Sequence, residues 1–313
     1  MVNTDISAAT LLELMQDKLK GISPVGLAPL MTLTGEMPPF SENILELHFD
    51  RFINNVDFAP RISKQFDDVL IPGYRLPFAP YSLRRLIEED HGIENIWIEY
   101  DTPFTRPPAL FFDPYRQAAF CPQTVYSCLQ QIAGCLNYPL TTRLLPFLEQ
   151  VQKLELRVMY YGCMFSRNTA SIRLTIHGMT PQTISMCLHQ LGWSGNYRVL
   201  KHLCSAYLHT GQQLVIGVDL ADSLSARIGI EVFDKDPGTF IHTLYANGRI
   251  NACHAALLAR WPGCRLLPEH VSRQLEQLQH RPADRLYTRI NHFKFIVDDT
   301  ELANIKGYLY YCY

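Results

Sequence analysis

The feature of this chain that most constrains its fold is a repeated order of two helix-like segments followed by two strand-like segments. The strand-like segments carry their charges on one face only. In Ser171–His177, residues 172, 174 and 176 are apolar, whereas residues 173, 175 and 177 are polar. A period of two places successive side chains on opposite faces of a strand. The order therefore predicts an antiparallel sheet with one apolar face and one polar face.

Four further segments show the same alternation. Their polar faces carry Glu155, Arg157, Met159 and Tyr161 in 154–161, Arg227 and Glu231 in 226–233, His292 and Lys294 in 291–297, and Lys306, Tyr308 and Tyr310 in 305–310. Two arrangements suit such strands. The sheet is either open, with its polar face in bulk water, or closed into a barrel whose polar face lines an interior pocket.

Three rounds of the repeat follow residue 120. The predicted helices cover 122–136 and 141–152, then 181–191 and 197–209, then 238–247, 252–260 and 268–279; the predicted strands cover 154–165 and 170–177, then 213–220 and 226–234, then 289–297 and 304–311. Prolines at positions 181, 237 and 268 mark helix starts. A repeat of roughly 60 residues that cannot bury its own sheet face implies units packed side by side.

The N-terminal part of the chain is less regular. Helical periodicity covers 5–20, 40–55 and 81–90, strands are expected at 93–101 and 107–113, and the stretch 56–80 has no assignment. Together with the repeats, this predicts a single α/β (α+β) barrel domain over residues 1–313, with about ten antiparallel strands surrounded by helices. A length of 313 residues with 47% hydrophobic content is sufficient for such a core.

Composition excludes several classes of protein. A net charge of -2 argues against a general nucleic-acid surface. The sequence has no apolar run of 18 residues and no basic-then-apolar leader at Met1, so neither a membrane span nor a signal peptide is expected. Nine cysteines without a CxxC pair suit reduced thiols. A cytoplasmic location is the default expectation.

Several short segments carry a resemblance to a known family. They are Arg106-Pro-Pro-Ala-Leu-Phe111-Phe112, Gly162, Ser166-Arg167, Ser171-Ile-Arg173-Leu-Thr175-Ile-His177, Gly195-Asn196-Tyr197, Asp219, Ile228-Gly-Ile-Glu231-Val and Lys306-Gly-Tyr308. Their order and strand chemistry resemble the ABBA prenyltransferases, and the small cyanobactin-type peptide prenyltransferases look most similar. The resemblance covers about two thirds of the chain and is strongest over residues 160–234.

The resemblance implies a function. An enzyme of this kind moves a dimethylallyl or geranyl group from its diphosphate to a side chain of a ribosomal peptide, through an allylic cation. The partners it implies are an isoprenyl diphosphate donor and a peptide acceptor. It also implies magnesium as the counterion of the diphosphate.

The residues provide the chemistry that such a reaction needs. Fixed cations on a rigid wall stabilise the charge of a departing diphosphate. The candidates for this role are Arg106, Arg173, Arg227, Lys294 and Lys306, with His177 beside them on the polar face. The alternative is that these are solvated charges on an open sheet.

The allylic cation needs shielding from water, and its acceptor needs to lose a proton. Tyrosine rings shield a cation with their negative faces, and Tyr161, Tyr308 and Tyr310 fall on the predicted inner faces, although ordinary packing also explains such rings. Glu99 is the first candidate for the base, and Glu231 is the second unless it only pairs with Arg227. An acidic pocket would favour a cationic acceptor, such as arginine or histidine, over indole or phenol.

Two other functions remain open at this point. One is an aromatic prenyltransferase acting on a small molecule, and the other is a non-catalytic barrel that binds a peptide or a phosphorylated metabolite. No metal site is predicted. The acidic run 298–301 lies between two predicted strands and suits a hairpin turn.

Overall fold

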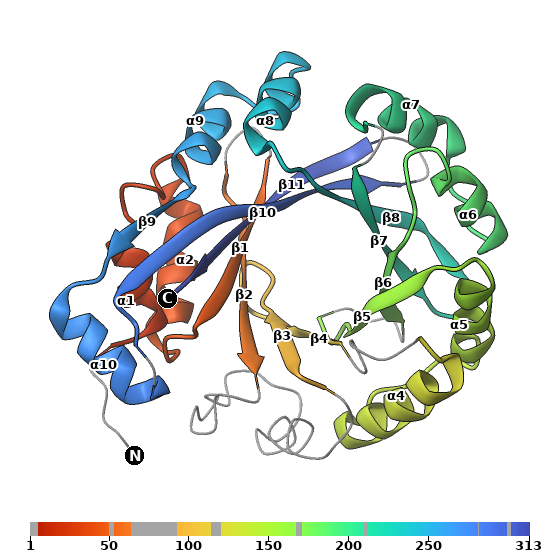
Figure 1. Cartoon of the computed structure of the whole chain (residues 1–313), viewed down its shortest axis with the longest axis horizontal. Coiled ribbons are helices and arrows are strands. Elements are labelled where there is room, and N and C mark those ends of the chain that lie inside the picture. The colour runs from red at the N-terminus through yellow and green to blue at the C-terminus, as the bar shows by residue number, and fades with distance from the viewer. Residues whose placement is uncertain are drawn as a thin grey trace.

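The computed structural model confirms a closed antiparallel barrel with helices outside it (Figure 1). It describes residues 6–49, 53–63, 93–113, 120–166, 171–209, 212–280, 282–298 and 302–313. Ten strands form the ring in the order β11-β1-β2-β3-β4-β5-β6-β7-β8-β10, and pairing of β10 with β11 closes it. The first strand of the chain thus pairs directly with the last.

The strands of the N-terminal part are β1 (Glu42–His48), β2 (Val56–Ser63), β3 (Asn95–Glu99) and β4 (Ala109–Phe112). Those of the repeats are β5 (Arg157–Cys163), β6 (Ile172–His177), β7 (Gln213–Leu220), β8 (Leu224–Phe233), β10 (Arg285–Val297) and β11 (Leu302–Cys312). A short strand outside the ring, β9 (Gly263–Leu266), pairs with the first residues of β10.

The helices lie around the ring and cover its outer face (Figure 1). In the described residues they are α1 (Ala8–Leu14), α2 (Pro24–Gly35), α4 (Pro122–Leu136), α5 (Leu144–Lys153), α6 (Ile184–Gln190), α7 (Tyr197–Tyr207), α8 (Pro237–Ala246), α9 (Ala252–Arg260) and α10 (Glu269–Gln279). None of these helices is both long and apolar enough to cross a membrane.

The hydrophobic core is the shell between helices and strands. Helix α4 buries Val125, Leu129 and Ile132, and the outer face of β6 buries Leu174 and Ile176. These residues belong to one contiguous cluster. The apolar side chains of the strands are buried against the helices outside the ring. The inner face of the ring can therefore carry polar side chains.

The repeats agree closely with the sequence prediction, whereas the N-terminal part corrects it. Residues 40–55 were predicted to be helical, but residues 42–48 form β1, and the unassigned stretch contains β2. Both faces of β1 are mostly buried, so its apolar residues do not show a clean period of two. Helix α2, which begins at the Ser23 cap, and strand β9 were missed. The helix expected at 81–90 lies outside the described residues.

Candidate active site

The polar inner face of the barrel surrounds a cavity of about 60 Å3. Residues from seven strands and from the loop after β3 line it: Glu46, Glu99, Asp101, Arg173, Gly217, Arg227, Ile228, Gly229, Lys294, Ile296, Lys306 and Tyr308. The structure therefore brings six of the predicted site residues together: Glu99, Arg173, Arg227, Lys294, Lys306 and Tyr308.

Three cations form what we call the basic wall of the cavity: Arg173 on β6, Arg227 on β8 and Lys294 on β10. Two of them are paired. Arg173 donates from Nε and Nη2 to the two carboxylate oxygens of Asp219, at 2.7 and 2.8 Å. Lys294 Nζ lies 3.1 Å from Glu231 Oε1. Arg227 makes no ion pair with any residue that the structure describes.

Strand register explains both pairs. Arg173 lies opposite Asp219 across β6 and β7, and Lys294 lies opposite Glu231 across β8 and β10. Residues directly opposite one another on paired strands point to the same face. The predicted alternative pairing of Glu231 with Arg227 is wrong, because both residues lie on β8 and the direct partner of Glu231 on β10 is Lys294.

Two facing glycines make room for Lys294. Gly217 on β7 lies opposite Gly229 on β8, and a Cβ built on Gly229 would clash with Cε of Lys294. A Cβ built on Gly217 has no neighbour closer than 3.8 Å. The lysine side chain thus runs across the position that a larger residue at 229 would fill.

The opposite side of the interior is acidic. Its four carboxyl groups, which we call the acidic wall, are Glu46 on β1, Asp57 on β2, Glu99 at the end of β3 and Asp101 in the loop after it. Glu46 and Asp57 face each other in the register of β1 and β2. Sequence reasoning missed both, because residues 40–55 were assigned to a helix and 56–80 to no element.

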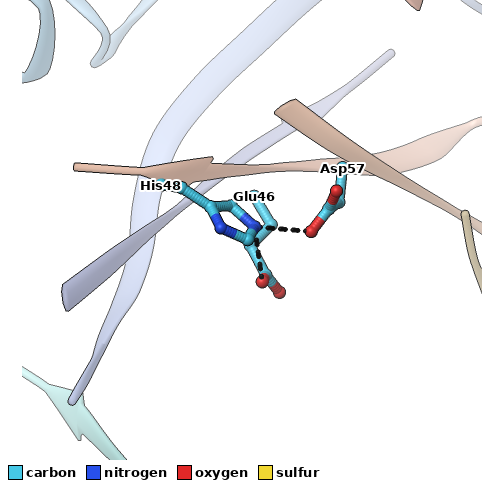
Figure 2. Close-up of side chains that lie close together, drawn as sticks. All are labelled: Glu46, His48 and Asp57. Atoms are coloured by element: carbon cyan, nitrogen blue, oxygen red, sulfur yellow. Dashed lines mark hydrogen bonds and ion pairs between the residues drawn. The ribbon is translucent and has the colours of Figure 1, made fainter. Parts of the chain in front are cut away.

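Lys306 and His48 contact part of the acidic wall. Lys306 forms an ion pair with Glu46, and its Nζ lies 4.0 Å from Asp57 Oδ2. His48 Nε2 lies 2.7 Å from Asp57 Oδ2 and 3.5 Å from Glu46 Oε1 (Figure 2). Lys306 on β11 is opposite His48 in the strand register. Glu99 and Asp101 make no ion pair with a described residue.

The uneven charge shifts the pKa values of these groups. Burial, together with the charges of Glu46 and Asp101, raises the pKa of Glu99 to about 8. Burial and the carboxylates of Asp57 and Glu46 also raise the pKa of Asp101. Burial opposes ionisation of Glu46, but the ammonium groups of Lys306 and Lys294 together outweigh it and hold the pKa of Glu46 well below its usual range. One carboxyl group is therefore firmly ionised and another takes up a proton near neutral pH.

Among the described residues, one group of three side chains has its potential metal-ligating atoms close together. These are Glu46, His48 and Asp57, whose donor atoms lie within 4.8 Å of one another. The arrangement does not fit a resident metal. Lys306 already supplies a positive charge to both carboxylates, and the Asp57 oxygen nearest His48 is engaged at 2.7 Å. Asp57 Oδ1 also accepts a hydrogen bond from the backbone N–H of Thr102 at 2.7 Å.

Tyr308 is the aromatic side chain that lines the cavity. Its ring stacks on the imidazole of His292, with centroids 3.9 Å apart, and Lys294 Nζ lies 5.7 Å from its centroid. Burial lowers the pKa of His292 to about 4. A neutral imidazole thus supports the Tyr308 ring from one side, and this support is a feature that the sequence did not reveal.

The other two predicted tyrosines differ from Tyr308. Tyr310 continues the same face of β11, opposite Arg289, whose guanidinium carbon lies 4.5 Å from the Tyr310 ring centroid. Tyr161 faces outward, because a register shift in β5 between Val158 and Tyr160 reverses the alternation. It lies opposite Leu174 in the outer core, so the prediction of Tyr161 on the inner face is wrong.

Two predicted cations do not line the cavity. Arg106 lies in the loop between β3 and β4, not on a strand, and its Nη1 donates to the carbonyl oxygen of Ser166 at 3.2 Å. His177 is the last residue of β6, opposite Arg157 and Val215. Four residues of strand separate it from Arg173, which corresponds to roughly 13 Å. Alternation predicts which face of a strand a side chain is on, but it does not predict how far along the barrel axis that side chain lies.

Comparison with known proteins agrees with this architecture. The apo form of the prenyltransferase PriB has a TM-score of 0.54 to this chain at 10% identity, and the match covers 97% of this chain and 96% of that chain. AnaPT from Neosartorya fischeri has a TM-score of 0.53 at 11% identity, covering 96% of this chain and 91% of that chain. No protein-family model and no curated protein sequence matches the chain. The shared fold is the predicted ABBA barrel.

Proposed function

We propose that this protein is a prenyltransferase that moves a dimethylallyl or geranyl group from its diphosphate to a side chain of a peptide. The observation that carries the proposal is the cavity inside the barrel, where four cations, a tyrosine ring and two carboxyl groups without an ion pair to any described residue converge. The fold shared with PriB supports it. The peptide acceptor rests on the resemblance of residues 160–234 to cyanobactin-type enzymes.

The basic wall and Lys306 are proposed to hold the diphosphate. Arg227 makes the first contact, since it carries no ion pair with a described residue and is exposed at the cavity. Arg173 and Lys294 keep their carboxylate partners while sharing their remaining N–H donors. Their rigid strands preorganise these donors, which favours charge separation as the allylic C–O bond breaks.

Tyr308 is proposed to shield the allylic cation, with Tyr310 next to it on the same face. A ring held by stacking on His292 presents a fixed negative face to a cation. Since that imidazole is neutral above about pH 4, it adds no positive charge next to the reacting carbon.

Glu99 is proposed to accept the proton that the acceptor loses. It lines the cavity without an ion-pair partner among the described residues, and its raised pKa makes it a stronger base than an ordinary carboxylate. Glu231 is the weaker candidate, because Lys294 already engages its carboxylate at 3.1 Å.

Magnesium is proposed only as a counterion that enters with the diphosphate. The Glu46, His48 and Asp57 group already contacts Lys306, so no resident ion is assigned to it. Repeating the titrations below with and without magnesium tests this proposal.

Isothermal titration with dimethylallyl and geranyl thiolodiphosphates, which do not ionise, tests the proposed function. Inorganic pyrophosphate serves as the reference. We expect both analogues to bind more tightly than pyrophosphate, and we expect Arg227→Ala to weaken binding by about ten-fold, the loss of one charge-assisted hydrogen bond. Arg198→Ala, an exposed arginine on the outer helix α7, is the matched control. Binding no tighter than that of pyrophosphate would favour a barrel that binds another phosphorylated ligand.

A further inference from the structure

The cavity is divided by charge, and its acidic side has fewer cations than carboxyl groups. Arg173, Lys294 and Lys306 each have a carboxylate partner. In the described part of the chain, Lys306 is the only lysine or arginine within ion-pair distance of the four carboxyl groups of the acidic wall, and the His48 imidazole contacts two of them. Glu99 and Asp101 therefore have no ion-pair partner among the described residues, and the more distant charges of Lys294, Arg173 and Lys306 do not offset their burial and their carboxylate neighbours.

This imbalance is a property of the empty cavity that a ligand can correct. Burial and the neighbouring carboxylates raise the pKa values of both Glu99 and Asp101. A cation placed between Glu99 and Asp101 would lower their pKa values, so that both ionise. It would then be attracted by each carboxylate. A neutral indole or phenol would supply no charge that favours their ionised forms.

We propose that the acceptor is a guanidinium group, that of an arginine side chain in a peptide, bound between Glu99, Asp101 and Glu46. This inference rests on the proposed function, because it names the acceptor of the same transfer. Glu99 and Asp101 are two residues apart at the end of β3, and Glu46 lies on β1, so the carboxyl groups reach the cavity from different strands. A planar group with five N–H donors matches several separated carboxylates better than a lysine ammonium does.

The transfer balances with these groups alone. The allylic C–O bond breaks first, and its electron pair leaves with the diphosphate on the basic wall. A guanidinium nitrogen then gives one N–H proton to the Glu99 carboxylate, and its lone pair forms the new bond to the allylic carbon. The product is a prenylated guanidinium, which is again a cation.

The first test compares three peptides that differ only in the central residue: arginine, its neutral isostere citrulline, and tryptophan. Each is titrated into the wild-type protein saturated with dimethylallyl thiolodiphosphate. We expect the arginine peptide to bind at least about ten-fold more tightly than the citrulline peptide. The reason is that a partly buried, charge-assisted hydrogen bond contributes more to the binding free energy than a neutral one does. Equal affinities, no binding of the arginine peptide, or a preference for tryptophan would overturn the inference.

Proton release provides a second readout. Binding of the arginine peptide near pH 7 should expel the proton from Glu99, which calorimetry in two buffers of different ionisation enthalpy detects. The citrulline peptide should release none. Equal release by the two peptides would contradict a cationic acceptor next to Glu99.

A matched pair of variants locates the site. Asp101→Asn should weaken binding of the arginine peptide while leaving the affinity for dimethylallyl thiolodiphosphate unchanged. Asp222→Asn, the same change at an exposed position between β7 and β8, should alter neither. An arginine affinity unchanged by Asp101→Asn would remove Asp101 from the acceptor site.

The two proposals fail in different ways. If the thiolodiphosphate binds but turnover with dimethylallyl diphosphate modifies only the tryptophan peptide, the proposed function stands and the guanidinium acceptor is wrong. Modification of a lysine peptide in preference to arginine would also overturn the guanidinium assignment. If the thiolodiphosphate does not bind, the proposed function fails, and this inference fails with it.

Discussion

The basic and acidic walls of the barrel are built in different ways. On the basic wall, Arg173 and Lys294 are each matched by a carboxylate directly opposite on the neighbouring strand. On the acidic wall, Glu46 and Asp57 are opposite one another, and a lysine from β11 supplies the compensating charge. One wall is thus a set of local pairs, whereas the other depends on the strand that closes the ring. The difference predicts distinct responses to mutation.

The largest effect is expected at the uncompensated end of the acidic wall. Glu99→Gln should lower the transfer rate by about 10²-fold or more, because the acceptor then lacks its proton acceptor. Affinity for dimethylallyl thiolodiphosphate should not change, since Glu99 is not among the proposed contacts of the diphosphate. Turnover is measured by mass spectrometry of the peptide product. Near-normal turnover would assign the proton to Glu231 or to water.

Lys306 and Arg227 should differ sharply in their contribution to stability. Lys306→Met leaves Glu46 and Asp57 buried with only His48 between them, which should cost about 3 kcal/mol of unfolding free energy. Arg227→Met removes an exposed charge without an ion pair among the described residues and should cost no more than about 0.5 kcal/mol. Urea unfolding measures both. Equal losses of unfolding free energy in the two variants would mean that Lys306 does not stabilise the buried carboxylates of Glu46 and Asp57.

The raised pKa of Glu99 predicts a loss of stability with rising pH. The unfolded carboxyl ionises near pH 4.5 and the folded one near pH 8, so between these values the folded state holds a proton that the unfolded state lacks. His292, with its pKa lowered from 6.5 to about 4, has the opposite effect, but only below pH 6.5.

Between pH 6.5 and 8, of these two groups only Glu99 therefore changes the free energy of unfolding with pH. Stability should fall there by at most about 2 kcal/mol, since one proton corresponds to about 1.4 kcal/mol per pH unit. The slope should flatten in Glu99→Gln, as urea unfolding at the two pH values will show. An unchanged slope would mean that Glu99 ionises normally in the folded protein.

The smallest effect is expected at the glycine pair beneath Lys294. Gly229→Ala forces Lys294 aside and loosens its pairing with Glu231, which should cost about 1 kcal/mol. Gly217→Ala, where the added Cβ has no neighbour closer than 3.8 Å, is the control and should cost less. Thermal unfolding compares the two. A larger loss for Gly217→Ala would place the lysine side chain elsewhere.

The sequence predicted the repeats well, because each of their strands has one apolar and one charged face. Helix Pro122–Leu136 and strand Gln213–Leu220 begin and end at the predicted residues. The N-terminal strands were harder. Strand β1 is buried on both faces and contains charged residues that only the closed barrel brings next to Lys306.

The basic wall was predicted, whereas the partners of its residues were not. Arg173, Arg227 and Lys294 follow from alternation, but Asp219 and the acidic wall depend on which strands are neighbours. Alternation also fails at a register shift, as Tyr161 shows. Of the predicted acids, Glu99 lines the cavity without a described ion-pair partner, and Glu231 is bound by Lys294.

The most direct test of the account is a crystal structure of the protein with dimethylallyl thiolodiphosphate. We predict that the diphosphate lies inside the barrel within hydrogen-bond distance of Arg227, Arg173 and Lys294, with the alkyl chain next to the Tyr308 ring. A diphosphate bound outside the barrel, or one that contacts none of these cations, would contradict the proposed function.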